Sequence, residues 1–122
     1  MKKETFNPES QLPLSPAVFH ILLSLADGER HGYAIMQDVA ASAGEQMGPG
    51  TLYGAIKRLL VSRWIEEAEE RPDPKLDDQR RRYYRLTANG QQVMESEAQR
   101  MAKLVALART RGVGRPCVLK PA

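Results

Sequence analysis

The segment GPGTLYGAIKRLL, residues 48–60, joins a turn containing glycine and proline to an amphipathic helix. On a helical wheel one face is apolar, and its members are Leu52, Ala55, Ile56, Leu59 and Leu60. The other side carries Gly54, Lys57, Arg58 and Val61, with Thr51 and Tyr53 at its flanks. A helix of this kind packs its apolar face on a core and leaves a basic face outside.

Two shorter helical patterns precede this segment. The first begins near Ser15 and Pro16, because serine caps helices and proline suits the first helical position. The second runs through HGYAIMQDVAASAG and stops at Gly44. The simplest assembly of the three helices places the last two in a helix-turn-helix arrangement.

The pattern changes after Arg63. The stretches WIEEAEER and RRRYYRLT favour strands, and the polar segment RPDPKLDDQ between them favours a loop. Thr87 then caps a last helix that runs to about Thr110. This order predicts a mainly α (α+β) winged helix-turn-helix fold, with a two-stranded β-hairpin as the wing and a long C-terminal dimerisation helix.

The expected domain organisation follows from the same patterns. The first residues, MKKETFNPESQLPLSP, contain three prolines and no sustained periodicity, so residues 1–14 are expected to form a flexible or loosely packed arm. Residues 15–87 would form the winged helix-turn-helix domain and residues 88–110 the dimerisation helix. Residues 111–122 are punctuated by glycine and proline and are expected to be disordered.

The distribution of charge points to double-stranded DNA. The net charge is only +3, but basic residues concentrate in two short stretches, 51–63 and 80–85, that contain no acidic residue. An α-helix fits the major groove, and a basic wing lies along the backbone or in the minor groove. The predicted DNA contacts are Thr51, Tyr53, Lys57 and Arg58 on the helix and Arg80, Arg81 and Arg82 on the wing.

Two simpler interpretations compete with DNA binding. Lys57 and Arg58 could be an ordinary solvated helix face, and the wing arginines could pair with glutamates of the neighbouring strand. Those glutamates are Glu66, Glu67, Glu69 and Glu70.

The last helix carries apolar residues at heptad spacing. Met94, Ala98, Met101, Val105 and Ala108 form the seam, and Leu104 and Leu107 broaden it. Val93 and Met94 lie near enough to the first helix to pack on it, whereas the far half of the helix is expected to pair with a second copy. A homodimer would place two recognition helices on half-sites about one turn of DNA apart.

Several classes of function lack the residues they need. Cys117 is the only cysteine, so the chain has neither an intrachain disulfide nor a thiolate cluster for zinc. Asp27, Glu29 and His31 lack the further ligands of a metal site, and no catalytic constellation or cofactor motif emerges. There is no apolar run of membrane-spanning length and no leader pattern, so a cytoplasmic location without membrane association is expected.

Four motifs, HGYAI, PGTLYGAIKRL, RRYYRLT and NGQ, resemble the PadR family of bacterial transcriptional regulators in order and spacing, from about Ser15 to Met101. The resemblance implies a winged-helix protein that dimerises through its C-terminal helix, binds an inverted-repeat operator, usually represses a gene and is released by a small-molecule effector or a stress signal. It adds Tyr33 to the DNA contacts predicted above. The chain departs from the family pattern at Gly54, where proline is common, at Arg63, where glycine is common, and at the wing tip, which lacks its usual glycine.

The sequence thus predicts a sequence-specific, non-enzymatic DNA-binding regulator that acts as a homodimeric repressor. The alternative is a winged-helix module for protein-protein interaction, which the acidic first strand of the hairpin favours. The effector remains open, because the last helix contains no aromatic residue that would mark a stacking site.

Overall fold

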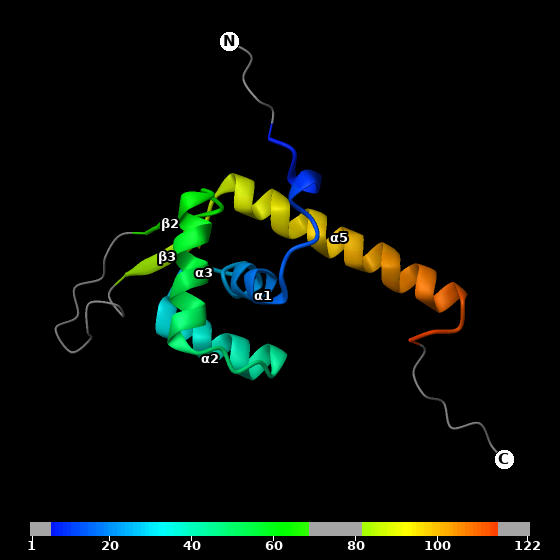
Figure 1. Ribbon diagram of the computed structural model, residues 1–122, viewed down its shortest axis with the longest axis horizontal. Coiled ribbons are helices and arrows are strands. Elements are labelled where there is room, and N and C mark those ends of the chain that lie inside the picture. The colour runs from blue at the N-terminus through cyan, green and yellow to red at the C-terminus, as the bar shows by residue number, and fades with distance from the viewer. Residues whose placement is uncertain (1–5, 69–81, 115–122) are drawn as a thin grey trace, which may run out of the picture.

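The computed structural model describes residues 6–68 and 82–114. Its elements are η1 Pro8–Gln11, α1 Pro16–Ser24, β1 Arg30–His31, α2 Gly32–Ala43, α3 Pro49–Val61, β2 Ile65–Glu67, β3 Tyr83–Leu86 and α5 Ala88–Thr110. Figure 1 shows α1 between α5 and α2, with α3 crossing at the edge that carries the sheet. The predicted mainly helical winged-helix fold is confirmed, long C-terminal helix included.

Local signals place the helix ends close to where the sequence predicts them. The Ser15 side chain caps α1 by accepting from the amide of Val18, and Gly44 ends α2 in the left-handed conformation with φ 68°. The third helix begins at Pro49, two residues before the expected Thr51. The buried faces of α1, α2 and α3 meet in one core around residues such as Ile21, Leu22, Ile35, Leu52 and Ile56.

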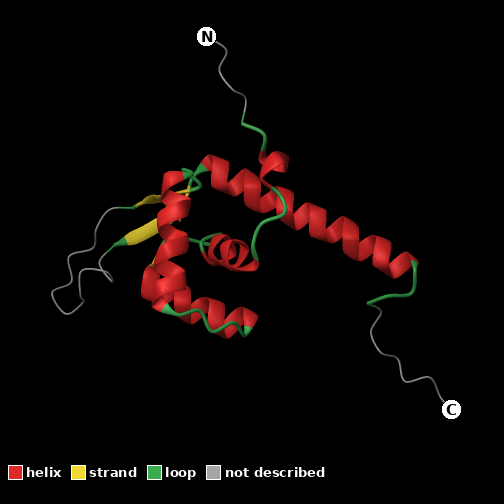
Figure 2. Cartoon of the chain, viewed as in Figure 1, coloured by secondary structure: helices red, strands yellow, loops and turns green. Residues whose placement is uncertain are grey.

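The sheet is larger than the predicted hairpin. It has three antiparallel strands in the order β1-β3-β2, and Figure 2 shows it as a small patch beside the helices. Arg30 pairs with Tyr84 and His31 with Tyr83, so a two-residue edge strand precedes α2. The predicted hairpin is present as the antiparallel pair of β2 and β3. The additional strand β1 is not predicted by the sequence, because it has only two residues and its partner β3 is distant in sequence.

The last helix, α5, extends beyond the rest of the molecule (Figure 1). Thr87 caps it, accepting from the amide of Gly90 at 3.1 Å. Its first turns join the core through Val93 and Met94. Among the described residues, no helix is long and apolar enough to cross a lipid bilayer.

The N-terminal arm is more ordered than the sequence predicts. Residues 8–11 form a turn of 3₁₀ helix that contacts α5, and Phe6, Leu12 and Leu14 pack against the core. From Phe6 onward the arm is therefore packed rather than flexible, because its apolar side chains contact the core and η1 contacts α5, neither of which local sequence reveals. Residues 1–5, and most of the tail expected at 111–122, lie outside the described residues.

Candidate nucleic-acid interface

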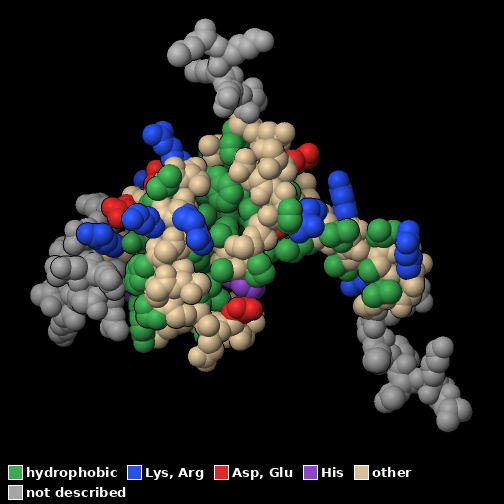
Figure 3. All heavy atoms as spheres, viewed as in Figure 1, with side chains coloured by type: hydrophobic (Ala, Val, Ile, Leu, Met, Phe, Trp, Pro, Cys, Tyr) green, Lys and Arg blue, Asp and Glu red, His purple; other side chains and the backbone are tan. Residues whose placement is uncertain are grey.

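The two faces of α3 differ as the helical wheel predicts. Leu52, Ala55, Ile56 and Leu59 are buried, and Leu60 is half-buried. The outer face exposes Thr51, Gly54, Lys57, Arg58 and Val61. Figure 3 shows Lys and Arg side chains gathered over the part of the molecule that carries α3. Within the part of the chain that the structure describes, neither Lys57 nor Arg58 forms an ion pair.

The first turn of α3 is open to an external acceptor. Gly48 is the N-cap and Pro49 the first helical residue, and no side chain caps the turn. Amides at a helix N-terminus that lack a side-chain cap, together with the helix dipole, suit a phosphate group. A hollow of about 610 Å³ lies beside this turn, with Tyr33, Gln37, Gln46 and Gly48 among its lining residues.

Tyr53 joins α3 to the start of α2. A Cβ atom added at Gly32 would lie 2.6 Å from the Tyr53 hydroxyl oxygen, so the phenol packs directly on that glycine. Tyr53 is half-buried, and its predicted phosphate contact must therefore be made from a side chain that also fixes the two helices against each other.

Tyr33 and His31 lie at the beginning of α2. Tyr33 is exposed and its ring stacks near that of His31, with centroids 6.5 Å apart. His31 accepts from the amide of Ala34 through Nδ1, at 3.0 Å, and its ring meets the edge of Tyr83 on β3. His31 therefore caps α2.

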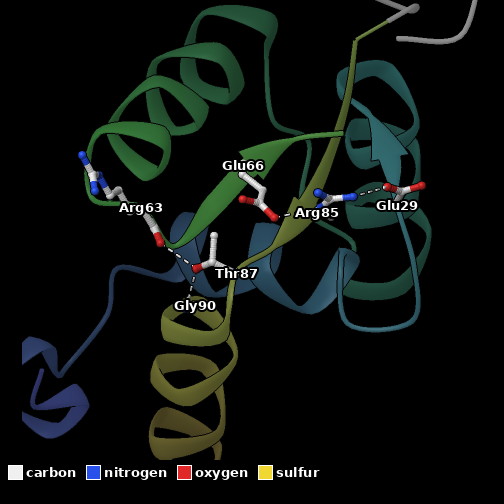
Figure 4. Close-up of polar contacts among 6 residues, drawn as sticks. All are labelled: Glu29, Arg63, Glu66, Arg85, Thr87 and Gly90. Carbon is white, nitrogen blue, oxygen red and sulfur yellow. Dashed lines mark hydrogen bonds and ion pairs between the residues drawn. The ribbon is translucent and has the colours of Figure 1, made fainter. Parts of the chain in front are cut away.

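The wing is described only in part. Arg82 is exposed immediately before β3, whereas Arg80 and Arg81 lie outside the described residues. Arg85 is occupied: its Nε lies 2.8 Å from Glu66 Oε1, and its guanidinium also pairs with Glu29 (Figure 4). The hydrogen bond to Glu66 raises the pKa of Arg85 above its ordinary value. A cross-strand ion pair with the glutamates of β2 thus forms at Arg85, while Arg80 and Arg81, for which such pairing is also possible, lie outside the described residues.

The residues weighed as metal ligands are engaged elsewhere. Asp27 pairs with Arg30 at 3.4 Å, Glu29 pairs with Arg85, and His31 caps α2. No group of three or more His, Cys, Asp or Glu within the described ranges is arranged to hold a metal ion.

The end of α3 is bound tightly to the beginning of α5. The amides of Arg63 and Trp64 donate to the carbonyls of Leu60 and Leu59, which closes α3 in a Schellman motif with Arg63 at φ 62°. The Thr87 hydroxyl then donates to the Arg63 carbonyl at 2.6 Å (Figure 4). A Cβ atom at Gly90 would lie 1.8 Å from the Trp64 carbonyl oxygen, so only glycine fits there.

The proposed dimer seam divides into a buried and an exposed part. Met94 is only 6 % exposed and packs in the core of its own chain, so its assignment to the dimer seam is corrected. Ala98, Met101, Leu104 and Val105 are exposed, and Ala108 is partly so. Leu107 adds to this apolar surface on the far half of α5.

Comparison with known proteins identifies the family. Residues 21–96 match the model of the transcriptional regulator PadR-like family, which is more than half of the chain. The chain belongs to the PadR-like family. The family that the four sequence motifs resemble is therefore confirmed.

Solved structures share this PadR-like fold. A PadR family transcription regulator from Clostridium difficile R20291 is 24 % identical, with a TM-score of 0.66 over 79 % of this chain and 97 % of that one. A PadR-like transcription factor from Bacteroides fragilis is 21 % identical, with a TM-score of 0.67 over 86 % of this chain and 98 % of that one.

A relative known by sequence is an uncharacterised 37.1 kDa protein in the transposon TN4556 of Streptomyces fradiae. It is 39 % identical over 84 residues, which is 69 % of this chain but 22 % of that protein. The PadR-like chain thus spans about a fifth of the length of this relative.

Proposed function

We propose that this chain is a sequence-specific DNA-binding regulator that acts as a homodimeric repressor on an inverted-repeat operator. The observation that supports it best is the outer face of α3, where Thr51, Lys57 and Arg58 are exposed opposite an apolar face that packs on the core. Arg82 at the base of the wing, and Arg80 and Arg81 before it, would add contacts to the phosphate backbone. Tyr33 and Tyr53 would contact phosphates from the α2 side.

Gly54 supports a close approach of DNA to α3. It lies in the middle of the helix, where glycine costs about 1 kcal/mol relative to alanine. A Cβ atom at this position would meet nothing within 4 Å, so packing within the described chain does not require glycine. We infer that the bare backbone at Gly54 allows the helix to enter the groove more deeply.

Dimerisation would use the far half of α5. The far half of α5 exposes four large apolar side chains, Met101, Leu104, Val105 and Leu107. Such a surface is unusual for a monomer, and a second copy of the same helix would cover it. Two recognition helices related by a two-fold axis require a near-palindromic operator.

Release by a small-molecule effector completes the proposal, and it rests on the family resemblance. A hollow of about 350 Å³ between the N-terminal arm and α5 has the size of a small-ligand site. Thermal denaturation with a panel of small molecules, followed by operator binding in the presence of those that stabilise the protein, tests this part.

The central experiment is selection of bound sequences from random DNA, followed by titration at several salt concentrations. Replacing Lys57 and Arg58 by alanine should abolish specific binding and lower the slope of log K against log salt by about one for each lost phosphate contact. The matched control is Lys103→Ala, which replaces an exposed lysine of α5. This variant should keep the operator affinity and the salt dependence of the wild-type protein. Binding without sequence preference at moderate salt would contradict the proposal.

A protein-interaction module is the second candidate function. Glu29 and Glu66 pair with Arg85 on the sheet and Glu67 is exposed beside them, so the sheet presents acidic groups. Recovery of one stoichiometric protein partner, with no enriched DNA, would favour this function over the first.

A further inference from the structure

Glu97 is a fully buried carboxylate at the point where α5 leaves the core. Its exposed fraction is 0 %, and it follows Val93 and Met94 on the packed side of the helix. From Ala98 to Leu107 every residue of α5 except Arg100 is exposed. Glutamate is almost never buried completely unless its charge is paired.

The partners of Glu97 come from two elements. One carboxylate oxygen, Oε2, accepts from the Leu14 amide at 2.8 Å, and the other, Oε1, accepts from Arg100 Nε at 2.5 Å. Leu14 immediately precedes Ser15, the N-cap of α1. The carboxylate thus fixes the middle of α5 to the start of α1.

A second attachment lies two turns earlier. Gly90 packs on the Trp64 carbonyl and Thr87 bonds to the Arg63 carbonyl, which fixes the beginning of α5 to the end of α3. Gly90 and Glu97 are separated by about 10 Å along the helix, and Thr110 lies about 20 Å beyond Glu97. A shift of about 1 Å at Glu97 would therefore move the far end of the helix by about 3 Å.

We propose that Glu97 is a positioning residue that sets the angle between α5 and the winged-helix domain, and thereby the spacing of the two half-sites that the dimer recognises. This inference rests on the proposed function, because it requires an α5-mediated dimer and an inverted repeat. A purely structural role for Glu97 differs in a measurable way: its loss would weaken binding to every operator equally.

The test uses Glu97→Gln in the full chain, with Glu95→Gln as the matched control. Glutamine keeps the volume and an acceptor for the Leu14 amide, but it removes the charge that faces Arg100. Glu95 is an exposed glutamate of α5, two residues before Glu97. Within the described chain its side chain accepts one hydrogen bond, from the Gln91 side chain. Arg100→Lys, which keeps the charge and loses the Nε hydrogen bond, is a milder second variant.

Wild-type protein first selects its operator, and binding is then measured on operators with half-sites moved by one and two base pairs. We expect wild type and Glu95→Gln to lose about tenfold or more in affinity for the altered spacings. Glu97→Gln should discriminate much less between spacings, and Arg100→Lys should lie between. An unchanged spacing preference in both Glu97→Gln and Arg100→Lys overturns the inference but leaves the proposed function intact.

A spectroscopic distance keeps the inference testable without an operator. Spin labels on Val61→Cys, in a Cys117→Ser background, report the separation of the two α3 helices in the dimer; Val61 is 78 % exposed. The distance distribution should be narrow for wild type and broader or shifted for Glu97→Gln. Identical distributions overturn the inference, whereas a monomeric wild type overturns the proposed function and the inference with it.

Discussion

Arg63 holds a backbone conformation that suits glycine. Its φ of 62° places it in the left-handed region, where a side chain costs about 1–2 kcal/mol. We expect Arg63→Gly to raise the free energy of unfolding by about 0.5–1 kcal/mol, because relief of strain outweighs the greater freedom of the unfolded chain. Urea denaturation measures this change. Ser62→Gly, at a neighbouring φ of −73°, is the control and should be destabilising.

Gly90 shows the opposite requirement. A methyl group at this position would overlap the Trp64 carbonyl, so Gly90→Ala should destabilise the protein by about 3 kcal/mol or more. Gly54→Ala is the matched substitution in open space, and it should stabilise the protein by about 1 kcal/mol. Thermal denaturation of both variants compares the two glycines. Equal effects of the two substitutions on stability would contradict the close packing of Gly90 on the Trp64 carbonyl.

At the level of elements, Glu97 connects the arm, α1 and α5. The hydrogen bond from Arg100, with that from the Leu14 amide, holds the pKa of Glu97 below its usual value despite burial. The ionised form therefore stabilises the fold near neutral pH, and this contribution is lost as the pH falls below about 4–5. Glu97→Gln should thus be less stable than wild type at pH 7, and the difference should narrow toward pH 3.

Urea titrations of wild type and Glu97→Gln across this range measure the difference. The other charged groups lining the arm side of α5 are Glu9 and Lys103, so Glu9→Gln serves as a control for titration within the arm. If the difference in free energy of unfolding between wild type and Glu97→Gln does not change with pH, the ionised Glu97 carboxylate is not the source of this stabilisation.

Elements whose signals are local could be predicted from the sequence. Ser15, Gly44 and Thr87 each mark a helix end through their own capping geometry, and α3 has a clear apolar face. The strand β1 and the packed arm could not be predicted, because each depends on a distant partner. Glu97 illustrates the reason. Its charge predicts an exposed position, although it lies one helical turn after the buried Met94, and its burial depends on a hydrogen bond from Leu14, 83 residues away in sequence.

The candidate site divides in the same way. The exposure of Lys57 and Arg58 follows from helical periodicity alone, whereas the pairing of Arg85 with Glu29 depends on the unexpected third strand. Helical periodicity places Tyr53 beside the basic face and predicts a contact with DNA, but its packing on Gly32 depends on the angle between α2 and α3, which the sequence does not give.

The proposed dimer can be tested through Leu104. This side chain is 51 % exposed on the far half of α5, remote from the core of its own chain. Leu104→Glu should leave the helical content and unfolding transition of the winged domain unchanged, while weakening dimerisation by about 30-fold or more. Light scattering over a range of concentrations measures the dimer. Lys103→Glu is the control, and equal dissociation of both variants would argue against a specific seam.

The attachment of α5 to the end of α3 also bears on how such a chain can change in evolution. Trp64, directly after α3, contacts Gly90, and Leu14 contacts Glu97. No flexible linker therefore separates α3 from the proposed dimer seam on α5. One residue inserted between Gly90 and Glu97 would turn the rest of α5 by about 100° and point its apolar face away from the partner. Relatives should therefore diverge here by substitution, and length changes should be confined to loops that bear on neither attachment.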